Sequence, residues 1–175
     1  MPTPFYSLVV VNANYRGSLN KNIDLALLQS QIPNSKFCNK PRQLIIKDKD
    51  GIVLFFRNGK FRIMGYIEEL DATFLAYIYT TLIDQEDCPA IHFQSMTAKV
   101  TLDKRLKLSM LHNLIPESQY EPELFPAMLV RKYKPTSVNI FSTGKIMICG
   151  VREVENIKSI MEDINTQLIT SSVMI

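Results

Sequence analysis

An internal repeat constrains the fold of this chain more than any other feature. Adding 85 to each residue number takes the stretch Lys40 to Glu68 onto residues 125–153, and 11 of its 29 positions are then identical without a gap. Unrelated segments of ordinary composition would share about two. A repeat of this length that occurs twice predicts a duplicated half-domain, because a solenoid needs three or more copies. We place the two repeats at residues 1–86 and 87–175.

Each repeat has the pattern of a strand, a helix, three strands and a second helix. Asp50-Gly51, Asn58-Gly59 and Thr143-Gly144 mark tight turns between β-favouring runs. In the first repeat we expect strands at 5–11, 42–47, 52–56 and 60–64, helices at 24–31 and 68–83, and loops at 12–22 and 33–41. In the second we expect strands at 93–102, 127–133 and 138–148, with its turn at 143–144, helices at 105–114 and 153–169, and a loop at 115–126. The two long helices each carry apolar residues at helical spacing, namely Leu70, Phe74, Leu75, Ile78 and Leu82 on the first and Val154, Ile157, Ile160, Met161, Ile164 and Leu168 on the second. Residues 84–89 form the expected linker, and residues 171–175 are left unassigned.

These elements predict an α+β fold of eight to ten antiparallel strands and four helices. The helices are enough to cover one face of the sheet, so the other face is expected to stay open to solvent or to a ligand. Strand alternation places Phe141, Lys145, Met147 and Cys149 on this face, together with Phe56, Lys60, Arg62 and Met64 of the first repeat. A phenylalanine at the end of a strand is more often a core residue, and that alternative stays open.

The bulk properties are those of a globular protein without a catalytic or metal centre. The chain has 175 residues, 46% of them hydrophobic, and a net charge of +3, which permits a nucleic-acid partner without requiring one. Three widely separated cysteines lack metal-ligand spacing and favour a reduced, intracellular protein. His92 and His112 are isolated, and no nucleophile motif or phosphate loop is present. We therefore expect no enzyme activity, no cofactor, no signal peptide and no membrane span.

The second repeat resembles that of the TATA-box-binding protein family. The resemblance is carried by Tyr120-Glu-Pro-Glu-Leu-Phe-Pro126, by Phe141-Ser-Thr-Gly-Lys145 and by Gly150, and the two-repeat layout matches the family over residues 6–168. It implies a saddle-shaped antiparallel sheet with helices on the convex face. It also implies a nuclear transcription initiation factor that binds and bends A·T-rich promoter DNA through the minor groove. A transcription factor IIB-like partner would be recruited.

The resemblance assigns roles to particular positions. It implies that Phe56, Phe125 and Phe141 are wedges that insert between base steps. Phosphate contacts are implied for Lys60, Arg131, Lys145 and Arg152, groove-lining positions for Met147 and Cys149, and contacts to the factor IIB-like partner for Glu121, Glu123 and Leu124.

The first repeat departs from the family at several of these positions. Lys40 stands where the repeat would place the partner of Phe125, and Phe37 could replace that wedge only if the loop is reshaped. Arg62 and Met64 replace small or β-branched groove-lining residues. Ile46 stands where an arginine would match Arg131, although Lys47 is adjacent.

Two further family contacts are uncertain in this sequence. Asn12 and Gln94 are the candidates for the minor-groove asparagines, but the register is not fixed. The acidic start of the helix at 68–83 places a transcription factor IIA-like contact in doubt, and acidic residues also suit any helix N-terminus. The sequence therefore predicts weaker or shifted A·T preference and an asymmetric bend. The alternative is a protein-interaction module that uses the same sheet without gripping DNA.

Overall fold

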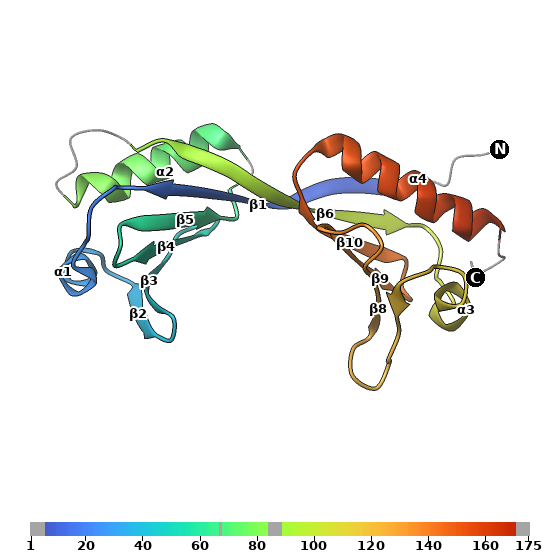
Figure 1. The fold of residues 1–175 in the computed structure, drawn as a ribbon. Helices are drawn as coiled ribbons and strands as arrows, with labels where there is room; N and C mark the ends of the chain where they lie inside the picture. The colour runs from blue at the N-terminus through green and yellow to red at the C-terminus, as the bar shows by residue number, and fades with distance from the viewer. Residues whose placement is uncertain (1–5, 67, 84–88, 171–175) are drawn as a thin grey trace. The chain divides into compact units, whose positions relative to one another are not determined.

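The computed structural model describes residues 6–66, 68–83 and 89–170, which form ten strands and four helices (Figure 1). The strands are β1 (Tyr6–Ser18), β2 (Ser35–Asn39), β3 (Arg42–Lys47), β4 (Ile52–Phe56), β5 (Lys60–Met64), β6 (Ile91–Leu102), β7 (Ser118–Gln119), β8 (Ala127–Val130), β9 (Ser137–Phe141) and β10 (Lys145–Val151). The helices are α1 (Leu25–Gln31), α2 (Glu69–Thr81), α3 (Leu108–His112) and α4 (Val154–Thr170). The predicted α+β class is confirmed, and the described strands and helices agree with the predicted eight to ten strands and four helices.

The strands are hydrogen-bonded in the order β2-β3-β4-β5-β1-β6-β10-β9-β8-β7. The chain divides into two compact units, one made of residues 12–94 and the other of residues 6–11 with residues 95–170. We call them the first unit and the second unit. β1 and β6 each pass from one unit into the other.

Local sequence explains why three strands match their predicted bounds. β3, β4 and β5 are separated by the Asp50-Gly51 and Asn58-Gly59 turns, and Gly59 has a φ of 76° that favours glycine. The Asp24 carboxylate caps α1 by accepting hydrogen bonds from the backbone N–H groups of Ala26 and Leu27.

Several elements differ from the sequence expectation. β1 extends to Ser18, although residues 12–22 were predicted to be a loop, and β2 and β7 lie in stretches that were also predicted to be loops. α3 covers only five residues, and β8 ends at Val130. The predicted linker at 84–89 and the tail at 171–175 lie outside the described residues, except for Pro89.

Each unit has its own hydrophobic core between its strands and its helices. In the first unit α1 and α2 pack on a strand face that contains Leu44, Val53, Phe55 and Ile63. Gly17 lies directly across from Phe61, and a Cβ there would stand 2.2 Å from the ring, so the glycine makes room for this aromatic side chain.

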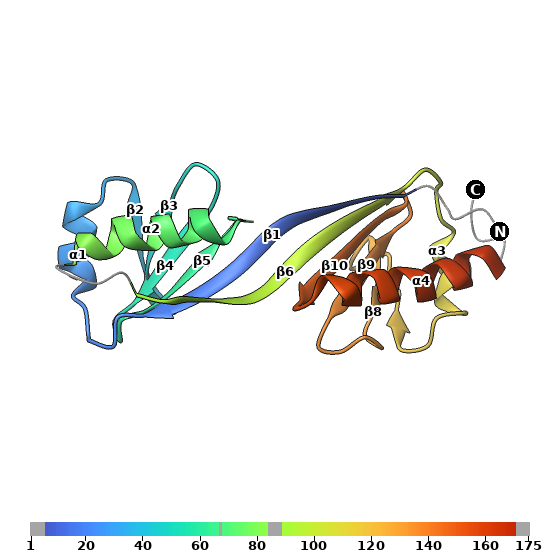
Figure 2. The same ribbon diagram turned by 90° about the horizontal axis from the view of Figure 1, so that it is seen from above.

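The second unit packs α3 and α4 on the corresponding strand face. Figure 2 shows α4 over β10, where Ile157, Met161, Ile164 and Leu168 join the core. The predicted apolar stripe of α4 is therefore buried, apart from Val154, which is exposed.

The apolar stripe predicted for α2 is not buried in this way. Of Leu70, Phe74, Leu75, Ile78 and Leu82, only Leu75 is buried, and the helix instead packs through Ala72, Leu75, Ala76 and Thr80. Small residues let the helix lie close to its sheet, so its large side chains point outward.

Candidate nucleic-acid interface

No helix among the described residues covers the second face of the strands in either unit, and the residues of this face follow from the strand registers. In the first unit, Gln43 pairs with Phe56, Ile45 with Leu54, and Leu54 with Arg62. Ser18 pairs with Lys60 and Asn14 with Met64. Since directly paired residues point to the same side, all of these residues share one face, which we call the open face of the unit.

The open face of the second unit is defined by the same rule. Ala127 pairs with Phe141, Leu129 with Asn139, and Asn139 with Met147. Met147 also pairs with Lys99, Cys149 with Thr97, and Lys145 with Thr101. Phe56, Lys60, Arg62, Lys145, Met147 and Cys149 therefore lie on the open faces of their units, on the strand parity expected from the sequence.

Strand pairing also corrects the alignment of the two repeats. Phe56 and Phe141 are the last residues of β4 and β9, and they pair with Gln43 and Ala127, which are 84 residues apart rather than 85. Ile46 and its partner Val53 are seven positions apart along the chain, whereas Val130 and its partner Val138 are eight apart, so the second connection holds one extra residue and the offset of 85 fails before β4. Lys47, and not Ile46, is thus the structural counterpart of Arg131, while Ile46 is buried in the core.

Basic residues recur at equivalent open-face positions. Lys47 corresponds to Arg131 and Lys60 to Lys145, while Arg16 corresponds to Lys99 because they pair with the equivalent residues Arg62 and Met147. Among the strand positions described for either open face, none is aspartate or glutamate. Both open faces are therefore positive over these strand positions. The carboxylate next to them in the second unit is that of Glu117, which lies opposite Arg131 at the end of the β7–β8 ladder and forms an ion pair with Lys134.

Arg16 and Arg62 form a direct cross-strand pair on the open face of the first unit. Both side chains are exposed, and among the described residues neither one takes part in an ion pair. Like charges placed directly opposite each other destabilise a sheet. An anion bound between them would relieve this repulsion.

Two phenylalanines meet where β8 begins and β9 ends. Phe125 lies in the loop before β8 and Phe141 ends β9, and their ring centroids are 6.3 Å apart in an edge-to-face arrangement. Phe125 is exposed and Phe141 half-buried. Their proximity gives the second unit an aromatic pair at the edge of its open face.

Phe37 does not reproduce this pair in the first unit. It pairs with Leu44, a core residue, so its ring lies on the helix side of the sheet. There it packs against the core, with the Arg42 guanidinium 6.0 Å from the ring centroid. Extending the β7–β8 register makes Tyr120, another aromatic residue packed on its core, the counterpart of Phe37. The β2–β3 turn itself consists of Lys40 and Pro41, and neither is aromatic.

The loop between β7 and β8 presents the proposed partner-binding residues together. Glu121, Glu123 and Leu124 are all exposed, Leu124 to 80%. The Glu121 carbonyl accepts hydrogen bonds from the backbone N–H groups of Leu124 and Phe125, which closes a turn. This turn fixes the position of the phenylalanine relative to the loop tip.

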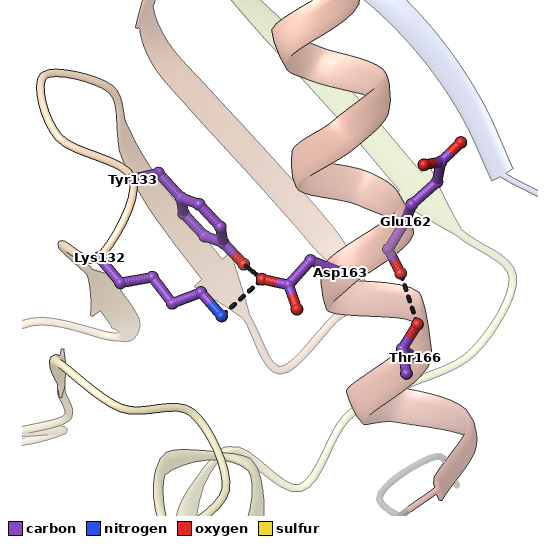
Figure 3. Close-up of polar contacts among 5 residues, drawn as sticks. All are labelled: Lys132, Tyr133, Glu162, Asp163 and Thr166. Atoms are coloured by element: carbon purple, nitrogen blue, oxygen red, sulfur yellow. Dashed lines mark hydrogen bonds and ion pairs between the residues drawn. The ribbon is translucent and has the colours of Figure 1, made fainter.

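A cluster on the helix side supports the β8–β9 connection (Figure 3). The Asp163 carboxylate of α4 pairs with the Lys132 ammonium at 2.5 Å and accepts a hydrogen bond of 2.8 Å from the Tyr133 hydroxyl. The hydrogen bond from Lys132 lowers the pKa of Asp163 against the opposing effect of burial, whereas burial and the bond to Asp163 raise the pKa of Tyr133. The cluster anchors the segment that starts at Arg131.

Asn12 and Gln94, the candidates for the minor-groove asparagines, already use their side chains in hydrogen bonds within the protein. Asn12 accepts a hydrogen bond from the Gly65 backbone N–H, and the Gln94 amide donates to the Phe93 carbonyl, so both side chains have partners. Arg152 is exposed in the turn before α4. Sequence reasoning missed Arg16, Lys99 and Asn139 on the open faces. The alternation of Ala13, Tyr15, Gly17 and Leu19 with polar residues was the signal for Arg16.

No metal-binding group of histidine, cysteine and acidic side chains occurs among the described residues. Within the same residues, no helix is long and apolar enough to cross a membrane.

Comparison with known proteins assigns the family. Residues 90–170 match the family model for "Transcription factor TFIID (or TATA-binding protein, TBP)". TATA-box-binding proteins of Methanococcus aeolicus and Archaeoglobus fulgidus are each 28% identical, covering 89% and 97% of this chain and 90% and 98% of their own. The solved structure of the Methanococcus jannaschii TBP superposes with a TM-score of 0.77 at 25% identity, over 93% of this chain and 98% of that one.

The chain belongs to the TATA-box-binding protein family. This is a family of DNA-binding transcription factors and not of enzymes. The family model matches only the second repeat, the half that carries the aromatic pair and the loop at 120–126.

Proposed function

We propose that this protein binds duplex DNA with its open faces and bends A·T-rich promoter DNA through the minor groove during transcription initiation. The observation that carries the proposal is the Arg16–Arg62 pair, two like charges held side by side on a face without carboxylates. Phosphates are the ligands that neutralise such a face. Lys and Arg residues that contact them release counterions and drive binding at low salt.

The two units contribute differently in this proposal. The second unit supplies the wedge, because Phe125 and Phe141 form an apolar pair suited to partial insertion between base steps. The first unit has Phe56 without a described aromatic neighbour, but it adds Arg62 where the second unit has Met147. An arginine is attracted to the narrow minor groove of A-tracts. The expected complex is therefore bent more strongly at the second unit and held more electrostatically at the first.

The remaining open-face residues complete this interface. Lys47, Lys60, Lys99, Arg131 and Lys145 would meet phosphates, with Arg152 at the margin. Met147 and Cys149 would line the groove beside Asn139. A side-chain amide can hydrogen-bond the acceptors that A·T pairs present in the minor groove.

The loop at 120–126 would recruit a transcription factor IIB-like protein. Two exposed carboxylates precede an exposed leucine there, a combination that fits a basic surface with an apolar pocket. The relatives of this chain include archaeal as well as eukaryotic proteins, so the family by itself assigns no compartment.

The test uses a short A·T-rich duplex with dyes at its two ends, titrated with the full chain at several salt concentrations. Binding with bending raises energy transfer, and the gain should fall steeply with salt. Phe141→Ala should reduce the gain in transfer, whereas Phe74→Ala, which removes an exposed ring on the helix side, should leave it unchanged.

Absence of binding at low salt would refute the proposal. A protein-interaction module would then be the better interpretation of the same sheet. If Phe141→Ala binds the duplex and bends it as strongly as the unmodified chain does, the proposed insertion of Phe141 is refuted, whereas the proposal of DNA binding still stands.

A further inference from the structure

We propose that α2 and the neighbouring β3–β4 loop form a docking site for a basic amphipathic helix of a partner protein. The site lies on the helix side of the first unit, away from its open face. The inference is independent of DNA binding and goes beyond the proposed function.

The first observation is an unpartnered apolar stripe on α2. Leu70, Phe74, Tyr77, Ile78 and Leu82 recur at helical spacing, and all are exposed, Leu70 to 84% and Phe74 to 65%. The helix buries Ala72, Leu75, Ala76 and Thr80 instead. α4 provides the internal comparison, because nearly all of its apolar stripe is buried.

The apolar area that the α2 stripe exposes to solvent is large for a monomeric protein. An aromatic side chain offers roughly 150–250 Å², so the two rings alone leave about 200 Å² accessible to solvent. The three aliphatic side chains bring the stripe into the range of about 300–600 Å² that marks the largest and often functional patches on monomers.

The second observation is a groove beside this stripe. Its apolar lining includes Tyr66, Phe74 and Ile78, and its volume is about 530 Å³. That is enough space for a few partner side chains. A groove next to a ridge of large apolar residues is the arrangement that receives the apolar face of a helix, with anchors at i, i+3 or i+4 and i+7.

The rim of the groove specifies the charge of the occupant. Asp48 and Asp50 come from the β3–β4 loop, and Glu68 and Asp71 from the start of α2. None of the four forms an ion pair with a described residue, and Lys49 is the one basic residue between the two loop aspartates. The helix dipole accounts for the acids at the start of α2, the Asp50-Gly51 turn accounts for Asp50, and Asp48 accepts a hydrogen bond of 2.5 Å from the Tyr66 hydroxyl. None of these interactions neutralises the carboxylates, so the rim stays negative.

Charge complementarity favours a basic helix over the other occupants. A second copy of this chain docked through the same patch would place the acidic rims against each other, since a two-fold interface is self-complementary. DNA and anionic membrane surfaces would be repelled by the same carboxylates. A helix with apolar anchors flanked by Lys or Arg satisfies both the stripe and the rim.

The test uses the full chain and two dye-labelled helical peptides with the same apolar face. One is flanked by lysines and the other by glutamates, and binding is followed by fluorescence anisotropy at low salt. The lysine peptide should bind at least tenfold more tightly. An Asp48→Asn/Asp71→Asn double variant should reduce this ratio to about threefold or less.

Apolar anchoring is tested with Phe74→Ser, which should weaken binding of the lysine peptide at least tenfold without unfolding the chain, because the ring is exposed. Val154→Ser removes an exposed apolar side chain from α4 and should change nothing. DNA bending should be the same in all these variants, so failure here is separable from failure of the DNA proposal.

Three results would overturn the docking proposal. The first is that the two peptides bind equally tightly, and the second is that neither peptide binds at a concentration of about 1 mM. The third is that Phe74→Ser binds the lysine peptide as tightly as the unmodified chain does. A dimer in sedimentation experiments that Phe74→Ser dissociates would instead identify a second copy as the occupant.

Discussion

Replacing Arg62 by glutamine should make the protein more stable and, at the same time, a poorer DNA binder. Arg62 faces Arg16 across β5 and β1, on a surface without a neutralising carboxylate. The substitution keeps most of the side-chain length and removes one of the two charges. A residue retained only for folding would not show this opposition between stability and binding.

The size of the stability change follows from the cross-strand geometry. Directly paired Cβ atoms are about 5 Å apart, and the longer guanidinium groups can spread to roughly 6–8 Å. Two unit charges at that separation repel by about 0.5–0.7 kcal/mol in water, and physiological salt screens part of this. Arg62→Gln should therefore raise the free energy of unfolding by a few tenths of a kcal/mol. Arg16→Gln should do the same, and the double variant should gain little more than either single variant.

The size of the binding change follows from counterion release. Each phosphate contact contributes about 0.9 to the slope of log affinity against log salt. Arg62→Gln should lower the magnitude of this slope by about 0.9. Between 50 and 200 mM salt, the affinity of the variant should therefore fall about 3.5-fold less than that of the unmodified chain.

Denaturant unfolding and salt-dependent DNA titration measure the two effects on the same samples. Lys158→Gln is the matched control, because it removes one positive charge from an exposed site on α4 and leaves the open face intact. It should change neither the cross-strand repulsion nor the salt slope. An Arg62→Gln variant that is less stable, or that keeps the full salt slope, would refute the reasoning.

Three further substitutions test other parts of the structure. Asp163→Asn should cost about 0.5–1 kcal/mol at neutral pH, and the loss should disappear as pH falls below the lowered pKa of Asp163, because protonation then breaks the same contacts in the unmodified chain. Thermal unfolding across pH measures this, and a loss that persists in acid would contradict it. Phe125→Ala should reduce DNA bending more than Phe37→Ala does, since Phe37 lies on the helix side; equal losses in energy transfer would disprove the asymmetry. Gly144→Ala should destabilise the second unit by more than about 1 kcal/mol, because φ is 85° and the new Cβ would stand 2.2 Å from the Lys104 carbonyl oxygen; an unchanged denaturation midpoint would contradict this.

The sequence predicts best where local chemistry dictates the backbone. Asp50-Gly51 and Asn58-Gly59 define the turns of the first meander, so β3, β4 and β5 have the predicted bounds. The open-face parity of Phe56 and Lys60 follows from the same turns.

Prediction fails where function and fold place opposite demands on a position. The second half of β1 was interpreted as a loop because Asn14, Arg16 and Ser18 are polar, yet they are polar because they lie on the open face. The α2 stripe was recognised as helical, but its spacing alone does not distinguish a buried stripe from an exposed one.

The repeat offset failed for a geometric reason. A connection longer by one residue shifts the alignment without removing the chance identities around Leu44 and Lys47. Only the pairing of β3 with β4 and of β8 with β9 places Lys47 with Arg131. The basic pattern shared by the two units is therefore more regular in the structure than in the sequence.

The passage of β1 and β6 between the units determines whether the chain can be divided into fragments that fold separately. Residues 6–11 come from the first sequence repeat but belong to the second unit, and residues 89–94 come from the second repeat but belong to the first unit. Neither half of the gene product contains all the strands of one unit. A fragment cut at the repeat boundary would lack a strand segment that the other fragment holds, so we expect neither fragment to complete a unit by itself.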